Sequence, residues 1–239
     1  MYRKYGKRLL DVLITVAALV FLAPVLLFLA AVARVLLGAP VLFRQQRPGL
    51  HGKAFTILKF RTMTQERDLA GKLLPDGRRL TRLGRFLRGT SLDELPELFN
   101  VLKGEMSLVG PRPLVLRYLP YFTERERTRL DMLPGITGWA QVNGRNDLSW
   151  DERLACDAWY VENCSLWLDL SILAMTVVKV LRRDNVQVDP GLSWRSLDEE
   201  RRERAGGRAS QPGEQPGGAA GLGRSECREQ RVAARHETE

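Results

Sequence analysis

The sequence is poor in the residues that usually hold small proteins together through covalent or metal bonds. Its 239 residues include three cysteines, Cys156, Cys164 and Cys227, and two histidines, His51 and His236. The number of cysteines is odd, no pair has C-x-x-C spacing, and neither histidine lies beside a cysteine. The sequence therefore predicts neither a disulfide framework nor a zinc cluster, which fits a reducing cytosolic setting.

An acidic surplus is also missing, because the formal net charge is +9. Residues 195–239 contribute none of it, since they hold nine Arg and nine Asp or Glu, so the surplus belongs to residues 1–194. A basic domain can face nucleic acid, an anionic membrane surface or phosphorylated small molecules. No helix-turn-helix, zinc or aromatic RNA-binding pattern is present, so nucleic acid is not an expected partner.

One long stretch lacks charge altogether. Residues 12–33 form a run of 22 residues without a charged side chain, which is long enough to cross a hydrocarbon core of roughly 30 Å. Pro24 lies near the middle of the run, where it removes a backbone hydrogen bond and predicts a bend or break. Lys and Arg flank both ends, which favours placing both ends on the cytoplasmic side. A re-entrant helix-break-helix anchor that dips into one leaflet satisfies these features, and a single kinked transmembrane helix or a signal peptide are the alternatives.

The remaining chain predicts short strands and several helices. Residues 40–45 and 54–60 are β-prone and flank a Pro/Gly-rich stretch, which indicates a hairpin. Helices are expected over residues 64–74, 81–87, 92–102, 150–161 and 165–181, with a loop at 104–113 and a turn-rich stretch at 135–144 that holds at most a short strand. The last helix is too short and too charged to cross a bilayer, so it packs in the core or lies at the membrane interface.

The expected fold is therefore α-dominated α+β, with three parts. Residues 1–38 form the re-entrant membrane anchor, and residues 39–194 form a compact cytosolic helical domain with a short β-hairpin. Residues 195–239 are rich in Arg, Glu, Gly, Pro and Gln with almost no aliphatic periodicity, so a disordered tail is expected there.

The densest group of reactive side chains lies between residues 78 and 112. Seven Arg or Lys surround four carboxylates in this segment, beside Gly-rich turns. Cations together with carboxylates are what a diphosphate and a divalent metal require. The four carboxylates are Asp93, Glu94, Glu97 and Glu105.

Asp93 and Glu94 have two interpretations. Ser91 followed by Glu94 fits a capping box, in which acidic residues only stabilise the start of a helix. Alternatively, Pro96 belongs in the first helical turn and places Asp93 where backbone amides point toward an anion. Adjacent residues do not share a helical face, so one carboxylate can attack while the other orients a metal or an acceptor.

Six ordered stretches resemble the bacterial sugar transferase family, the small monotopic polyprenyl-phosphate phosphoglycosyl transferases. The resemblance covers roughly residues 3–190. One departure is Ala23, which precedes Pro24 where the family often has Ser, so a hydroxyl that could satisfy a freed backbone group is absent. The stretches are residues 7–11 (KRLLD), 43–49 (FRQQRPG), 59–63 (KFRTM), 90–102 (TSLDELPELFNVL), 107–113 (SLVGPRP) and 134–145 (PGITGWAQVNGR).

The resemblance implies a two-step transfer of a sugar 1-phosphate from a UDP-sugar to polyprenyl (undecaprenyl) phosphate, with release of UMP and Mg²⁺ as cofactor. This is the first step of exopolysaccharide, capsule, O-antigen or glycoprotein glycan assembly. The implied location is the bacterial inner membrane, with the catalytic domain on the cytoplasmic face. Membrane lipids and downstream glycosyltransferases are the implied partners, and the sequence fixes neither the sugar nor whether the chain is a monomer or a dimer.

The same resemblance assigns residues. Asp93 becomes the nucleophile that carries the phosphosugar, and Glu94 binds metal or activates the acceptor, so both are catalytic and metal-binding candidates. The substrate-binding candidates, which otherwise read as ordinary surface cations or polar residues, are Lys59, Arg88, Arg112, Gln141 and Arg145.

Two rival functions remain open. A non-catalytic membrane-tethered scaffold of polysaccharide assembly would use the basic surface to hold anionic lipids or partner enzymes. Among enzymes, direct single-step transfer is the rival to the covalent route. The scaffold predicts that Asp93→Asn leaves function intact.

Overall fold

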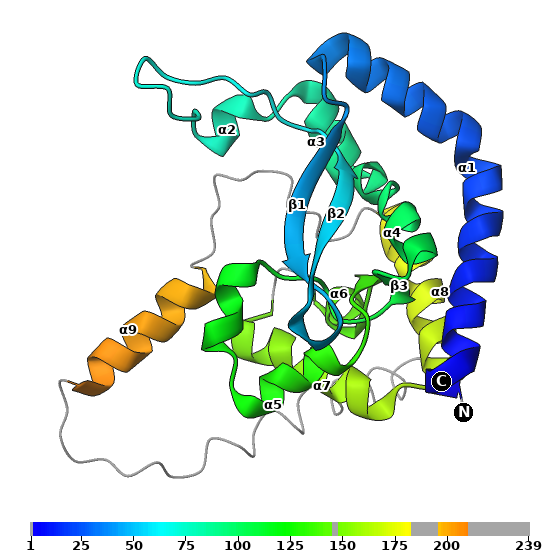
Figure 1. Cartoon of the computed structure of the whole chain (residues 1–239), viewed down its shortest axis with the longest axis vertical. Coiled ribbons are helices and arrows are strands. Elements are labelled where there is room, and N and C mark those ends of the chain that lie inside the picture. The colour runs from blue at the N-terminus through cyan, green and yellow to red at the C-terminus, as the bar shows by residue number, and fades with distance from the viewer. Residues whose placement is uncertain (1, 145–147, 183–195, 210–239) are drawn as a thin grey trace.

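A computed structural model describes residues 2–144, 148–182 and 196–209. The chain forms a long N-terminal helix, two small sheets and a set of shorter helices around them (Figure 1). The helices are α1 (Lys7–Leu37), α2 (Asp76–Arg79), α3 (Arg82–Gly89), α4 (Glu97–Lys103), α5 (Glu124–Arg127), α6 (Trp139–Asn143), α7 (Trp150–Asn163), α8 (Leu166–Arg182) and α9 (Leu197–Ala209). The short helical turns are η1 (Tyr2–Gly6), η2 (Leu50–Gly52), η3 (Leu92–Glu94), η4 (Leu116–Tyr121) and η5 (Thr128–Asp131). The strands are β1 (Leu42–Pro48), β2 (Ala54–Phe60), β3 (Ser107–Val109) and β4 (Gly135–Thr137). The predicted α+β class with an apolar N-terminal helix is confirmed.

The predicted hairpin is confirmed. Strands β1 and β2 pair antiparallel, with Leu42 opposite Phe60 and Pro48 opposite Ala54. The inward side chains of β2, Phe55 and Ile57, are buried in the main core against Leu98 of α4. The hairpin stands at the centre of the molecule (Figure 1), and residues of both strands, Gln45 and Lys59 among them, border the cavity described below.

A second sheet differs from the prediction. Residues 104–113 were expected to be a loop, but β3 pairs in parallel with β4, so that Ser107 lies opposite Gly135 and Val109 opposite Thr137. A three-residue strand leaves almost no local pattern, and its partner lies far away in the sequence. The two backbones approach so closely that a Cβ at Gly135 would lie 2.1 Å from the amide nitrogen of Gly110.

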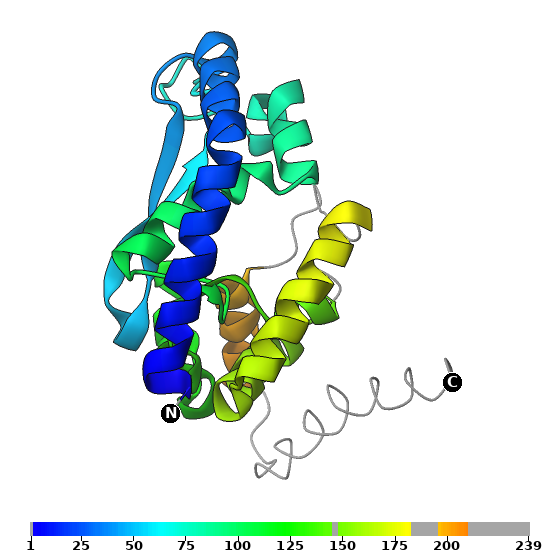
Figure 2. The ribbon, with the colours of Figure 1, turned by 90° about the vertical axis from the view of Figure 1, so that its right-hand side faces the viewer.

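The N-terminal third of α1 is fixed to the domain by polar contacts. Lys7 forms a buried ion pair with Asp169 of α8 at 2.6 Å, and the Asp11 carboxylate accepts a hydrogen bond from the amide of Leu108. From this contact α1 and α8 diverge along the same face of the molecule (Figure 2). Arg8 donates to the carbonyl oxygens at the end of α4.

The C-terminal third of α1 returns to the domain. Leu29 is buried in a second cluster with Phe60 and Leu87. Arg61 donates to the carbonyl oxygens that end α1, those of Leu37 and Gly38, and to that of Ala39. Both ends of this helix therefore contact one domain.

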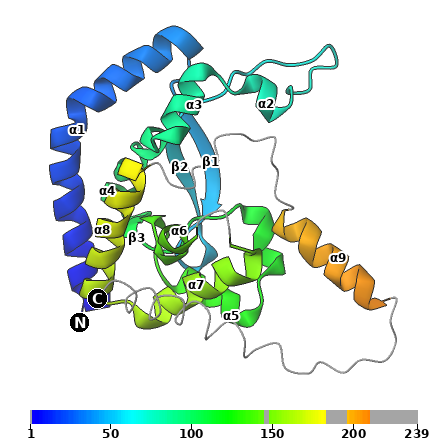
Figure 3. The same ribbon diagram turned by 180° about the vertical axis from the view of Figure 1, so that it is seen from behind.

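The middle of α1 is apolar and largely exposed. Its most apolar window has a mean hydropathy of 2.9, and only 11% of that window is buried. Phe21, just before Pro24, is 86% exposed. The helix stays continuous through Pro24 while its axis bends (Figure 3), so the expected bend is present and a complete break is not. Among the described residues, α1 is the only helix long and apolar enough to cross a membrane, and its topology stays a prediction.

Helix α8 combines the two roles that the sequence left open. Asp169 and Ile172 are buried on the face that packs in the core. On the other side, Trp167 is 77% exposed and Leu181 78% exposed. The helix therefore has a packed face and an uncovered apolar face.

Two predicted helices are corrected by the structure. The segment of residues 64–74 is not helical, because it folds into a loop held by isolated bridges such as that of Arg67 with Leu73. The helix predicted over residues 92–102 divides into η3 and α4, with Pro96 as the N-cap of α4. In both places, contacts with the rest of the chain override the local pattern.

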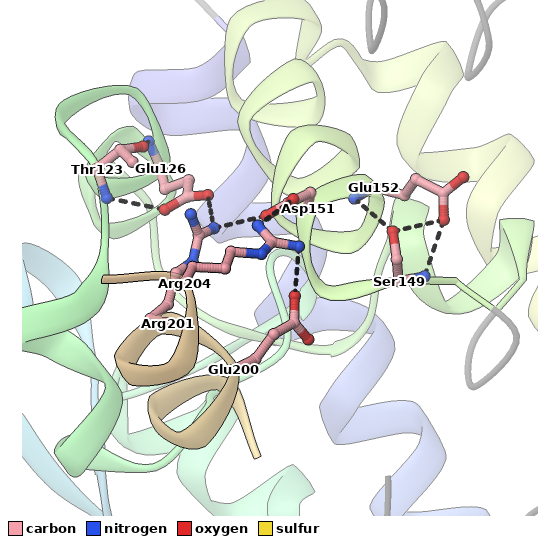
Figure 4. A network of polar contacts seen from close by, with 8 residues as sticks. All are labelled: Thr123, Glu126, Ser149, Asp151, Glu152, Glu200, Arg201 and Arg204. Atoms are coloured by element: carbon pink, nitrogen blue, oxygen red, sulfur yellow. Dashed lines mark hydrogen bonds and ion pairs between the residues drawn. The ribbon is translucent and has the colours of Figure 1, made fainter. Parts of the chain in front are cut away.

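The prediction of a disordered tail over residues 195–239 is also wrong for part of that range. Helix α9 docks against the far side of the domain from α1 (Figure 1), and Leu197 at its start is completely buried beside Leu154. Figure 4 shows its polar contacts: Arg201 donates to Glu126 and Asp151, and Arg204 donates to Asp151. The remainder of the predicted tail, residues 210–239, lies outside the described residues.

Candidate active site

A cavity of about 750 Å³ opens beside the hairpin. Its wall combines β1 and β2, the segment of residues 61–67, η3 and the residues that follow β3. Eight cationic side chains line it against four carboxylates, so the cavity suits an anionic ligand. The cations are Arg47, Lys59, Arg61, Arg67, Arg79, Arg88, Arg112 and Arg153, and the carboxylates are Asp76, Asp93, Glu94 and Asp157.

The carboxylate of Asp93 lines this cavity. No hydrogen bond or ion pair to it occurs within the described part of the chain, although the side chain is half-buried. Burial, followed by the negative charge of Glu94, raises the pKa of Asp93 to about 6, against the opposing charges of Lys59, Arg88 and Arg112. At neutral pH Asp93 is therefore a mostly ionised carboxylate whose oxygens are free to meet a ligand.

Glu94 has the opposite environment. Its Oε1 atom accepts hydrogen bonds from Nζ of Lys59 and Nη2 of Arg112, each at 2.6 Å. Burial opposes ionisation of Glu94, but Arg112 and Lys59 outweigh it and hold the pKa of this carboxyl well below its usual range. Two adjacent carboxylates thus differ in role, because one is neutralised by cations and the other is not.

Glu97 completes the cluster, and sequence analysis assigned it no role. Its Oε1 atom lies 3.0 Å from Nζ of Lys59, one turn beyond Glu94. Burial and the charge of Glu94 raise the pKa of Glu97 to about 7. The Glu94–Pro96–Glu97 spacing was the available signal, but only the fold shows that Lys59 lies between the two carboxylates.

The local backbone explains why Asp93 and Glu94 point differently. Ser91 adopts a left-handed conformation with φ of 56°, and its side chain makes no capping hydrogen bond. The capping-box interpretation of Ser91 and Glu94 is therefore wrong. The tight turn η3 directs Glu94 toward Lys59 and leaves Asp93 at the cavity wall.

Arg112 is held in place from behind. Its carbonyl oxygen accepts a hydrogen bond from Nη2 of Arg129 at 2.6 Å, and Arg129 forms a buried ion pair with Asp157 at 2.7 Å. Arg112 follows β3 by three residues, so the parallel pairing of β3 with β4 also fixes the position of its backbone. No local sequence pattern predicts a role for Arg129 or Asp157.

Two of the three other predicted substrate-binding residues lie at the cavity. Arg88 lines the cavity, and its Nε atom donates to the hydroxyl of Thr62. Gln141 also lines it: its amide nitrogen donates to the carbonyl of Ile136, while its Oε1 atom is buried without a partner in the described structure. Arg145 lies outside the described residues.

A divalent metal is compatible with this donor set. The described residues contain no group of three or more His, Cys, Asp or Glu that could hold a metal by themselves. Mg²⁺ commonly uses one or two carboxylates together with substrate phosphates and water. The uncommitted carboxylate of Asp93 fits that requirement, whereas Oε1 of Glu94 is already bonded to two cations.

Comparison with known proteins identifies close similarities. A family model described as bacterial sugar transferase matches residues 2–183. The sugar transferase EpsL of Bacillus subtilis (strain 168) is 55% identical over 181 residues, covering 76% of this chain and 90% of EpsL.

Two further relatives carry more specific names. The undecaprenyl-phosphate galactose phosphotransferase of Salmonella typhimurium (strain LT2) is 42% identical over 202 residues, covering 76% of this chain and 41% of the relative. The UDP-glucose:undecaprenyl-phosphate glucose-1-phosphate transferase of Caulobacter vibrioides is 42% identical over 190 residues, covering 75% of this chain and 71% of the relative. The chain therefore spans less than half the length of the Salmonella relative.

Proposed function

The chain belongs to the bacterial sugar transferase family, and on that premise we propose that it transfers a sugar 1-phosphate from a UDP-sugar to a polyprenyl phosphate, releasing UMP. It is a phosphoglycosyl transferase. The names of the Salmonella and Caulobacter relatives state undecaprenyl phosphate as acceptor, which supports the choice of substrates. The product, polyprenyl diphosphate carrying one sugar, would start the assembly of a surface polysaccharide or glycan and pass to downstream glycosyltransferases.

The observation that carries the proposal is the carboxylate of Asp93 in a cation-lined cavity, where none of the described residues pairs with it. A diphosphate needs positive charge to reduce its repulsion from an attacking carboxylate. Lys59, Arg88 and Arg112 surround Asp93 closely enough to act on its charge. A carboxylate with a purely structural role would instead form ion pairs within the protein, as Glu94 does with Lys59 and Arg112.

The proposed reaction has two steps. An oxygen of Asp93 attacks the β-phosphorus of the UDP-sugar, and the bond from that phosphorus to the bridging oxygen breaks, so that UMP leaves with the bridging oxygen. A phosphate oxygen of the polyprenyl phosphate then attacks the same phosphorus, and the bond to Asp93 breaks. The carboxylate is regenerated, and sugar and lipid are joined through a diphosphate.

The neighbouring residues would divide the remaining work. Arg112 and Arg88 would hold donor phosphates, since a guanidinium matches phosphate geometry. The unpartnered Oε1 atom of Gln141 would accept a hydrogen bond from a donor hydroxyl. Lys59 would keep Glu94 ionised, ready to orient the acceptor or a metal.

Mg²⁺ is proposed as the cofactor, with Asp93 and Glu94 as its candidate protein ligands. When bound, it would neutralise charge on the diphosphate and the departing UMP. Asp93 and Glu94 would supply its carboxylate oxygens, and the arginines that line the same cavity would bind the phosphates.

The proposed location is the inner membrane, with the domain on the cytoplasmic face and α1 re-entrant. Lys7 near one end of α1 pairs with Asp169, and Arg61 binds the carbonyls at the other end. A helix whose two ends are attached to one domain favours an anchor that enters and leaves the membrane on the same side. Its bare apolar middle would face lipid.

The decisive experiment is a UMP-release assay with the purified full chain, Mg²⁺ and undecaprenyl phosphate across a panel of UDP-sugars. We expect release with at least one sugar, and loss of release by ~10³-fold or more in Asp93→Asn. An Asp93→Asn chain that turns over at the normal rate would favour the scaffold function.

The covalent route has its own test. Without acceptor, a donor labelled in the sugar should leave label on the peptide that contains Asp93. Turnover without any labelled peptide would favour single-step transfer.

A further inference from the structure

A second, smaller cavity lies next to the first and differs from it in character. Its volume is about 240 Å³, and it lies between η3, α4, β4, α6 and the C-terminal half of α8. Most of its wall is aliphatic, in contrast to the eight cations of the larger cavity. The aliphatic wall comprises Leu92, Leu95, Leu98, Ile136, Val142 and Val180.

The two cavities meet at Glu94. Ser91, Glu94 and Gln141 line both of them. Asp93 faces the larger cavity only, so the smaller cavity reaches the site from the side of Glu94. The mostly aliphatic wall of this cavity offers few hydrogen-bonding groups, so it suits neither a nucleotide nor a sugar.

The outer end of the small cavity adjoins an uncovered apolar surface. Val180 belongs to its wall and is 40% exposed, and Val177, Val178 and Leu181 of the same helix are exposed beside it. Lys179, half-buried, contributes the only cation of the lining within the described residues. The cavity thus offers an apolar entrance, an aliphatic wall and one positive charge.

We propose that this small cavity binds the phosphate-proximal isoprenoid units of the acceptor lipid. This inference rests on the proposed function and adds the acceptor's route: the lipid enters past Val180, lies along Leu95 and Leu98, and presents its phosphate at Glu94. Polarity matches at both ends, because the isoprenoid is aliphatic and its phosphate would lie where Lys59 and Arg112 already neutralise Glu94. Donor and acceptor then reach the site from two adjacent cavities of different chemistry.

The size of the cavity limits what it holds. Sites for complete small molecules usually measure roughly 300–1,000 Å³, so a cavity of about 240 Å³ takes only the first part of a long polyprenyl chain. The rest of the lipid remains in the membrane. A short acceptor such as farnesyl phosphate should therefore use the same contacts as undecaprenyl phosphate.

The test compares two matched variants of α8 in the purified full chain. Val180→Asp places a charged carboxylate in the part of the wall that the isoprenoid would contact, so that binding of the lipid would desolvate this charge. Leu170→Asp places the same charge on a residue of the same helix that is equally exposed, at 40%, and neither lines the cavity nor borders its entrance. Steady-state KM is measured for farnesyl phosphate in detergent and for the UDP-sugar, so that membrane insertion does not affect the result.

We expect Val180→Asp to raise the KM for farnesyl phosphate about tenfold or more and to change the KM for the UDP-sugar less than twofold. Leu170→Asp should change neither by more than twofold. Equal acceptor KM values in the two variants, with an active wild-type chain, would overturn the cavity assignment and leave the proposed function standing. A wild-type chain that releases no UMP from any donor would overturn the proposed function itself.

A measurement on the wild-type chain removes any dependence on folding of the variants. A photoreactive farnesyl phosphate, with the reactive group on the first isoprene unit, should label peptides from η3, α4 or the C-terminal half of α8. Excess undecaprenyl phosphate should abolish this labelling. Labelling confined to α1 would contradict the proposed route.

Discussion

The Nζ atom of Lys59 lies 2.6 Å from Oε1 of Glu94 and is the link between two buried carboxylates. Its second partner is Glu97 at 3.0 Å, so one ammonium from strand β2 neutralises residues on both sides of Pro96. Burial opposes the charge on Lys59, but Glu94 and Glu97 outweigh it and raise its pKa. The position of Glu94, and therefore the free state of Asp93, depends on this contact.

Replacing Lys59 tests that dependence. Lys59→Met should leave two buried carboxylates short of positive charge and lower the free energy of unfolding by ~3–5 kcal/mol, the range typical of a broken buried ion pair. Chemical denaturation measures the change. The control is Lys103→Met, at an exposed residue of α4, which should change stability by less than ~0.5 kcal/mol. A loss of similar size in both variants would contradict the structural role of Lys59.

The pH dependence of the first step should report Asp93. The pKa of this carboxyl is raised to about 6, and only the ionised form can attack phosphorus. UMP release in a single turnover without acceptor should therefore fall about tenfold per pH unit below pH 6 and level off above about pH 7. Omitting the acceptor matters, because a phosphate monoester also titrates near pH 6. A rate that is flat from pH 5 to 8 would exclude Asp93 as the attacking group.

Asp93→Asn should inactivate the enzyme and stabilise the fold. Burial and Glu94 raise the pKa of Asp93 in the folded chain from its ordinary value of 3.8 to about 6. Stability therefore falls as pH rises between these two values, and the loss is complete above them. Removing the charge should raise the free energy of unfolding by about 1–3 kcal/mol at pH 7.5. The gain should shrink toward pH 4, as measured by denaturation at both pH values.

The control for this variant is Asp131→Asn, because Asp131 is 56% exposed in its side chain and lies at the surface. Its stability should change little at either pH. A destabilised Asp93→Asn chain would mean that Asp93 makes a stabilising contact in the folded state.

The attachment of α1 should depend on Asp169. This buried carboxylate accepts hydrogen bonds from Lys7 and from the hydroxyls of Tyr2 and Tyr160, each at 2.6 Å. Asp169→Ala leaves the buried Lys7 charge without its partner, so we expect a loss of ~3–5 kcal/mol. Limited proteolysis should cut near residue 7 faster than in wild type. Asp131→Ala, as an exposed control, should leave the cleavage rate unchanged.

The close contact of β3 and β4 gives a further prediction. A methyl group at Gly135 would lie 2.1 Å from the backbone nitrogen of Gly110, and neither backbone can move without displacing the residues before Arg112. Gly135→Ala should cost ~1–3 kcal/mol, as overpacking typically does, and should reduce activity as well. Gly77→Ala is the matched control, because nothing lies within 4 Å of its added carbon. Similar melting temperatures for the two variants would refute the steric argument.

Local sequence patterns predict much of the secondary structure of the chain. The uncharged run of residues 12–33 forms one long helix, and the β-prone runs around the Pro/Gly-rich stretch form the hairpin. Helices α7 and α8 lie within two residues of the predicted bounds. These elements depend on periodicity and turn chemistry, which neighbouring residues supply by themselves.

Only the tertiary structure determined which residues distant in sequence contact one another. Lys59 and Arg112 lie 35 and 18 residues from Glu94, yet both bind the same carboxylate oxygen. Strand β3 exists only because β4 lies beside it, and α9 is held by burial of Leu197 and by ion pairs to distant residues. The sequence determined which residues are reactive and which segment is apolar. The fold decided which carboxylate is paired, because ion pairs, burial and the resulting pKa values arise only when distant segments pack together.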